Sequence, residues 1–151
     1  MLRLSKKMLF AIEAVLDIAY HTGSEPVQSS EITRRQGIPR RYLEQALQQL
    51  VRHGVLIGVR GPRGGYRLAR ERRKISVGDV VRVVREVESS DANDGDICQS
   101  ELGCRILQPM IESMQSEMMT KLDSITIEDL CSDAYKANIV SEGRRNLDFA
   151  I

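Results

Sequence analysis

The sequence has few cysteines, no long apolar run and no recognisable leader. Its three cysteines, Cys98, Cys104 and Cys131, are an odd number. An odd count argues against a secreted disulfide scaffold and favours thiol or metal chemistry in a reducing compartment. No apolar run is long enough to cross a bilayer, and the first residues resemble neither a signal peptide nor a basic, acid-poor leader. We therefore expect a soluble cytoplasmic protein that does not bind membranes.

Motifs of catalytic and nucleotide-binding sites are also missing. The chain shows no Ser/His/Asp order typical of a hydrolase and no cysteine-histidine pair at zinc-binding spacing. Residues 60–65, RGPRGG, are rich in glycine, but strand-like alternation lies on both sides of them. They therefore do not form a nucleotide loop that opens a helix. We predict that the chain is not an enzyme.

The charge of the chain is divided unevenly along its length. The net charge of the 151 residues is +1. Residues 1–75 hold 15 lysines and arginines against 6 acidic residues, a balance of +9, whereas residues 76–151 hold 7 against 15, a balance of −8. A basic half suits a polyanion, and an acidic half is better suited to hold partners or a sensor.

Residues 39–53 predict an amphipathic helix with a surface that suits nucleic acid. The residues spaced to pack against a core are Tyr42, Leu43, Ala46, Leu47, Leu50 and Val51. The residues left on the outer face are Arg40, Arg41, Glu44, Gln45, Gln48 and Gln49. Arginine and glutamine make paired hydrogen bonds to guanine and adenine edges, and the major groove is wide enough for one helix. We predict that this helix binds double-stranded DNA.

A cationic hairpin follows this helix directly. Residues 55–59 alternate like a strand, residues 60–65 supply turn formers with two arginines, and alternation resumes at Tyr66 and Leu68. The tip suits a minor groove or phosphates. Helices are also expected at 5–20 and 29–35, the second capped by Ser29 or Ser30, so residues 29–53 have helix-turn-helix spacing. The predicted fold is mainly α with a small β wing.

The acidic half predicts a second unit built on a long helix. A helix should begin at the capping-box-like residues 76–79, a loop should span 88–104, and helices should cover 105–122 and 126–134. The long helix carries the apolar stripe Ile106, Met110, Ile111, Met114, Met118 and Leu122. We interpret the stripe as a dimerisation surface, the alternative being the core of a monomer. We therefore divide the chain into a winged helix-turn-helix DNA-binding domain (1–87), a sensor loop (88–104), a dimerisation helix with a short following helix (105–134) and a flexible tail (135–151).

Three segments together resemble the BadM/Rrf-two family of bacterial winged-helix regulators, which includes IscR, NsrR and CymR. They are RYLEQALQQLVRHGVL, VRGPRGGYRL and ISVGDVVRVV, and the similarity extends from Leu4 to about Leu130. The resemblance implies a homodimeric transcription factor that binds a palindromic operator. It places Arg41, Tyr42 and Glu44 at recognition-helix positions and Arg60, Gly61, Pro62 and Arg63 in the wing.

The resemblance also implies an iron-sulfur cluster, of the two-iron type, in the loop before the long helix. Family members that bind one carry three loop cysteines at spacings of six. Cys98 and Cys104 match the second and third, while Ala92 and Leu107 stand where a further cysteine and a histidine would be. Because common clusters need four ligands, the set is incomplete. Others would have to come from Asp91, Asp94, Asp96, Cys131, a partner subunit or an external thiol.

Three interpretations of Cys98 and Cys104 remain open: a cluster with unusual ligands, a redox-active pair, or inert residues in a regulator controlled by a partner or metabolite, as for CymR-like members. Cys131, among apolar positions, is expected to be a buried structural thiol. The predicted function is sequence-specific DNA binding in transcription regulation. A protein-interaction module and a thiol oxidoreductase are the alternatives from other classes.

Overall fold

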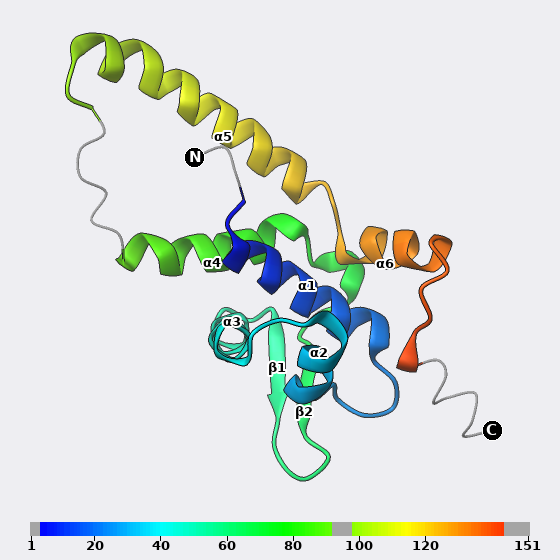
Figure 1. Ribbon diagram of the computed structural model, residues 1–151. Helices are drawn as coiled ribbons and strands as arrows, with labels where there is room; N and C mark the ends of the chain where they lie inside the picture. The colour runs from blue at the N-terminus through cyan, green and yellow to red at the C-terminus, as the bar shows by residue number, and fades with distance from the viewer. Residues whose placement is uncertain (1–3, 92–97, 144–151) are drawn as a thin grey trace.

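The computed structural model describes residues 4–91 and 98–143, and it is mostly helical with one small antiparallel sheet (Figure 1). The predicted fold class is confirmed. Helix α1 (Lys6–His21) begins after Ser5, whose hydroxyl oxygen accepts a hydrogen bond from the Met8 N–H at 3.3 Å. It lies at the centre of the molecule and packs against α2, α3, α4 and α6. Its buried apolar residues are Met8, Ala11, Ala14, Val15, Ile18 and Ala19.

Helices α2 (Ser29–Gln36) and α3 (Arg40–Arg52) form the expected helix-turn-helix. Gly37 ends α2 with φ +66°, a backbone conformation that glycine adopts without steric cost. The predicted cap at Ser29 or Ser30 is wrong, because the capping residue is Gln28. The Gln28 N–H donates to the Glu31 carboxylate at 2.8 Å, which is the hydrogen bond that the N3 residue of a capping box makes.

The hairpin consists of β1 (Leu56–Val59) and β2 (Gly65–Leu68). Leu56 pairs with Leu68 at its base, and Val59 pairs with Gly65 at its tip. Val27 adds an isolated bridge to Tyr66, with N–H to O distances of 3.0 and 2.8 Å. This bridge anchors the wing to the segment that precedes α2, so the wing and the helix-turn-helix keep a fixed relation.

A 3-10 turn, η1 (Arg72–Lys74), leads into α4 (Val77–Asp91), where the predicted capping box is present. The Ser76 N–H donates to Asp79 and the Asp79 N–H donates to the Ser76 hydroxyl, each at 3.0 Å. The helix runs beyond the predicted loop boundary at residue 88. The Ser5 hydroxyl donates to Glu88 at 2.9 Å, and this tertiary contact supports the last turns after the apolar periodicity ends.

A π-helical turn, η2 (Gly103–Leu107), continues into the long helix α5 (Gln108–Asp123), and α6 (Ile127–Lys136) follows. In Figure 1, α5 extends away from the winged helix at the end nearest η2. At its other end, backbone hydrogen bonds of 2.8 Å join Val77 to Ile125 and Ile127 to Ile75. Ile75 and Ile127 are fully buried. These contacts fix the C-terminal end of α5 to the start of α4.

The structure differs from the predicted flexible tail over residues 135–143. Helix α6 includes Tyr135 and ends at Lys136, and the segment that follows is hydrogen-bonded to α1 and α2. The segment shows little apolar periodicity because polar contacts with distant residues hold it in place, and such contacts need no repeating apolar pattern. The rest of the predicted flexible tail, including Leu147, Phe149 and Ile151, lies outside the described residues.

No helix in residues 4–91 and 98–143 combines the length and the apolarity needed to span a membrane.

Candidate DNA interface and cysteine pair

Three fully buried leucines fix the rotation of helix α3. Leu43, Leu47 and Leu50 face the core, which turns Arg41, Gln45 and Gln48 outward, and all three outer residues are exposed. Within the part of the chain that the structure describes, the Arg41 side chain has no ion pair or hydrogen bond. Its guanidinium is therefore available to a ligand. One cation followed by two amides on the same helix face can contact both base edges and phosphates.

Arg40 and Glu44, both predicted to bind DNA, bind each other in this structure. The Arg40 Nε atom lies 2.9 Å from the Glu44 Oε1 atom, one helical turn away. The two side chains remain 82% and 50% exposed, so water screens the pair and DNA can compete with it. Glu44 consequently limits how far Arg40 is free to reach a phosphate.

Tyr42 lies at the edge of α3, beside α1. Its ring centroid is 6.2 Å from that of Phe10, at an interplanar angle of 36°. A groove of about 350 Å³ follows this edge. The residues that line it are Lys7 and Phe10 of α1, Tyr42, Gln45, Ala46, Gln48 and Gln49 of α3, and Val84, Val87 and Glu88 of α4. Three residues predicted to bind DNA, Tyr42, Gln45 and Gln48, therefore border a groove. The periodicity of α3 alone could not show that this groove exists.

The wing tip projects two exposed arginines. Gly61 has φ +111°, which a residue with a Cβ rarely adopts, so glycine suits this turn. Arg63 is 86% exposed and lies 3.6 Å from the Glu25 carboxylate, whereas Arg60 has no polar partner within residues 4–91 and 98–143. Sequence reasoning missed Glu25, because no local pattern relates it to a hairpin nearly forty residues away.

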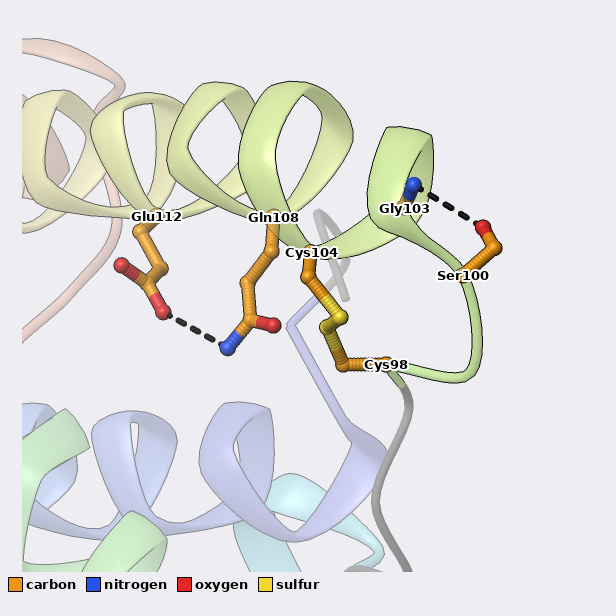
Figure 2. The surroundings of a disulfide bond; sticks show 6 residues. All are labelled: Cys98, Ser100, Gly103, Cys104, Gln108 and Glu112. Atoms are coloured by element: carbon orange, nitrogen blue, oxygen red, sulfur yellow. Dashed lines mark hydrogen bonds between the residues drawn. A yellow bond between two sulfur atoms is a disulfide. The ribbon is translucent and has the colours of Figure 1, made fainter.

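Cys98 and Cys104 are joined by a disulfide at the start of the η2 and α5 helical region (Figure 2). Their Cα atoms are 5.0 Å apart, a separation common in disulfides. The Cys104 N–H donates to the Ser100 carbonyl at 2.9 Å, and the Gly103 N–H donates to the Ser100 hydroxyl at 3.1 Å. Figure 2 shows the disulfide linking the loop at Cys98 to the helical turn at Cys104. The predicted pair is therefore brought together.

The described residues do not complete a ligand set for an iron-sulfur cluster. Within residues 4–91 and 98–143, no three histidine, cysteine or carboxylate side chains converge as a metal site. Cys131 is 3% exposed in α6, which lies at the far end of α5, about 24 Å along a 16-residue helix. Burial raises the pKa of the Cys131 thiol, which disfavours a ligating thiolate. Ala92, Asp94, Asp96 and the side chain of Asp91 lie outside the described residues.

The comparisons with known proteins agree with this architecture. A family model described as "Rrf2: Iron-dependent Transcriptional regulator" matches residues 4–133. The chain belongs to the Rrf2 family. Among curated relatives, the HTH-type transcriptional regulator IscR of Sodalis glossinidius is 35% identical over 144 residues, covering 92% of this chain and 84% of that protein. The IscR of Vibrio vulnificus is 34% identical over 151 residues, covering 99% and 88%.

Solved structures support the same membership. That of T. potens IscR aligns with a TM-score of 0.72 at 34% identity, covering 92% of this chain and 93% of that one. That of CymR, the global cysteine regulator of B. subtilis, aligns with a TM-score of 0.66 at 30% identity, covering 87% and 98%. This Rrf2-family protein is a DNA-binding transcriptional regulator and not an enzyme. A general protein-interaction module is not favoured.

Proposed function

We propose that this Rrf2-family regulator binds a palindromic operator as a homodimer and changes its DNA affinity with the oxidation state of Cys98 and Cys104. The observation that carries the DNA-binding geometry is the exposed row of Arg41, Gln45 and Gln48 on a helix held by three buried leucines. We infer that α3 enters the major groove, with Arg40, Tyr42 and Glu44 at its margins. Arg60, Gly61 and Arg63 then contact phosphates or the minor groove.

The dimer is supported by the unburied apolar face of the η2 and α5 region. Helix α5 has no buried residue in the single chain, and the large apolar residues exposed by 38–73% on or just before it are Leu102, Ile106, Leu107, Met110, Ile111 and Met114. An apolar stripe of this length needs a second apolar surface, and an antiparallel copy of itself supplies one. Two-fold symmetry of the dimer would impose two-fold symmetry on the operator.

The division of the chain follows from these roles. We assign residues 1–87 to DNA binding, 88–104 to sensing and 105–134 to dimerisation, in a regulator that works in the cytoplasm. The described part of the sensing segment joins α5 directly through η2, so a change at the cysteines is close to the surface proposed to pair two protomers. A shift there can alter the spacing of the two reading helices.

The cysteine chemistry needs only a two-electron exchange. Reduction by a dithiol adds two electrons and two protons to the Cys98–Cys104 disulfide and releases two thiols. The structure supports this interpretation because the two sulfur atoms are already bonded. A two-iron cluster on the same two thiolates is the second candidate, favoured by the family's description as iron-dependent. It requires two further ligands from undescribed residues, a partner subunit or a small thiol.

The visible absorption spectrum of the protein purified without oxygen, together with its iron and sulfide content, separates these candidates. Charge-transfer bands with stoichiometric iron and sulfide would establish a cluster. A colourless protein whose affinity for a duplex selected from random DNA differs between dithiothreitol and diamide treatment would establish the redox pair. The Cys98→Ala, Cys104→Ala double variant is the control. If the wild-type protein and the double variant bind the duplex equally well after dithiothreitol and after diamide treatment, sensing by these cysteines would be contradicted.

A further inference from the structure

After α6 the chain passes the C-terminal end of α1 as residues 137–143, which we call the C-terminal strap (Figure 1). Three hydrogen bonds attach the strap to the end of α1. The Tyr20 hydroxyl donates to the Ile139 carbonyl, the Ser141 hydroxyl donates to the Tyr20 carbonyl at 2.6 Å, and the Glu142 N–H donates to Nδ1 of His21 at 3.1 Å. Backbone and side-chain groups both take part, so the strap is held in one defined position against α1, which we call its seat.

The backbone at the end of the strap lies directly against the loop after α1. A Cβ atom added at Gly143 would come within 2.2 Å of the Thr22 carbonyl oxygen, and one added at Gly23 would come within 3.3 Å of the Gly143 carbonyl oxygen. Only a residue without a side chain can approach this closely at position 143. The close approach places the preceding residue, Glu142, at the end of α2.

Glu142 makes ion pairs with both arginines in the last turn of α2. Its Oε2 atom lies 2.9 Å from Arg34 Nη2 and 2.6 Å from Arg35 Nη1. The remaining nitrogens of Arg35 donate to the buried Asp17 of α1 at 2.9 and 2.7 Å, and the amide of Gln36 donates to Asp17 at 2.8 Å. Arg35 is thus held between α1 and the strap.

Helix α2 depends on these polar contacts because it contributes little to the core. It has eight residues, of which only Ile32 is buried. Residues 37–39 are all that separates it from α3, so a change in the position of α2 is transmitted to the start of α3. We propose that Glu142 is a positioning residue for DNA recognition: the strap fixes α2 against α1 and thereby sets the orientation in which α3 meets DNA.

His21 makes this seat sensitive to pH. Its Nδ1 atom accepts a hydrogen bond from the Glu142 N–H only when that nitrogen carries no proton. The charged groups around it are Asp17 of α1, Arg34 and Arg35 of α2, and Glu142 of the strap, with Glu25 and Glu31 across a polar pocket of about 190 Å³. Burial lowers the pKa of His21, partly offset by Asp17. The strap is therefore seated at neutral pH and loosens as pH falls through this lowered pKa.

The variant Glu142→Gln tests the positioning role in the full chain. We expect it to bind the duplex selected by the wild-type protein about tenfold more weakly, because charge-assisted hydrogen bonds to α2 are lost. Affinity for a scrambled duplex should not fall, since two arginines lose their carboxylate partner. Asp123→Asn is the matched control, because it removes the carboxylate that pairs with Arg82, far from α2. Equal losses on both duplexes, or the same result from both variants, would overturn the proposal.

The variant His21→Asn tests the same seat by a readout that a loss of stability would not change. Its side-chain oxygen can accept the Glu142 N–H but has no proton to gain, so operator affinity at neutral pH should be kept. The extra loss of affinity that the wild-type protein shows as pH falls below neutral should be reduced in the variant. A pH profile identical to that of the wild type in His21→Asn would contradict the role of the strap.

Discussion

Arg35 and Asp17 form an ion pair inside the protein. Two guanidinium nitrogens of Arg35 lie 2.9 and 2.7 Å from the two carboxylate oxygens of Asp17, and the side chains are 8% and 0% exposed. Removing the Asp17 carboxylate takes away the partner of two Arg35 nitrogens and of the Gln36 amide, and it leaves the partly exposed Glu142 as the remaining partner of Arg35. We expect Asp17→Asn to lower the free energy of unfolding by about 3–5 kcal/mol, measured by urea denaturation at neutral pH.

The exposed pair between Arg82 and Asp123 provides the comparison for this measurement. These side chains are 52% and 39% exposed, so water solvates either charge when the other is removed. Asp123→Asn should cost about 0–1 kcal/mol. A cost for Asp17→Asn no larger than that for Asp123→Asn would show that Glu142 or water compensates the Arg35 charge when Asp17 is removed.

Arg41 provides the direct test of base recognition by α3. If its guanidinium binds a guanine edge, Arg41→Ala should weaken binding of the selected duplex by about 1–3 kcal/mol and leave scrambled DNA much less affected. Fluorescence anisotropy titrations at one fixed salt concentration measure both affinities. Lys121→Ala, on the exposed part of α5, removes a cation elsewhere and serves as control. An equal loss on both duplexes would make Arg41 a phosphate contact.

Glu25 should restrain the wing, since its carboxylate lies 3.6 Å from Arg63. Glu25→Gln frees Arg63 for phosphates, so we expect tighter binding to selected and scrambled DNA alike. Arg63→Ala should do the opposite and reduce the slope of log affinity against log salt concentration by about 0.9. In the double variant, Glu25→Gln should have little further effect. An unchanged salt slope in Arg63→Ala would remove the wing tip from the phosphate contacts.

The sequence was sufficient for the elements that local chemistry determines. A helix predicted over 39–53 is found at Arg40–Arg52, and turn formers at 60–65 lie between β1 and β2 as expected. Apolar spacing and turn residues act over a few positions, so both can be read from one segment. The short spacing between Cys98 and Cys104 likewise allowed the bond that the structure contains.

Relations between distant segments could not be predicted in this way. The contacts of Phe10 with Tyr42, Glu25 with Arg63 and Glu142 with α2 join positions separated by 32 or more residues. Each depends on how whole elements pack, and a single chain carries no periodic signal for it. The strap is the clearest case, because a segment of weak pattern is ordered by hydrogen bonds to backbone and side-chain atoms of Tyr20 and His21 in α1.

The apolar face of α5 leads to a prediction about assembly. A charge placed among its exposed methionines should be tolerated in the monomer, where water solvates it. It should destabilise the dimer, because pairing of the two helices would remove the charge from water. We expect Met110→Glu to shift sedimentation from dimer to monomer while the helical circular dichroism signal is kept. Ser116→Glu adds the same charge on the opposite side of α5 and should leave the dimer intact. A Met110→Glu protein that still sediments as a dimer would place the interface elsewhere.

The three cysteines should differ sharply in reactivity once the disulfide is reduced. Cys131 is buried, and burial raises the pKa of its thiol, so at pH 8 its thiolate fraction is lower than that of an exposed cysteine. Cys98 and Cys104 are only partly buried and occupy a short turn at the start of the helical region. After treatment with dithiothreitol, iodoacetamide should therefore modify Cys98 and Cys104 first. Mass spectrometry of the peptides should find Cys131 labelled only after denaturation. Rapid labelling of Cys131 in the folded protein would mean that α6 opens readily from α1.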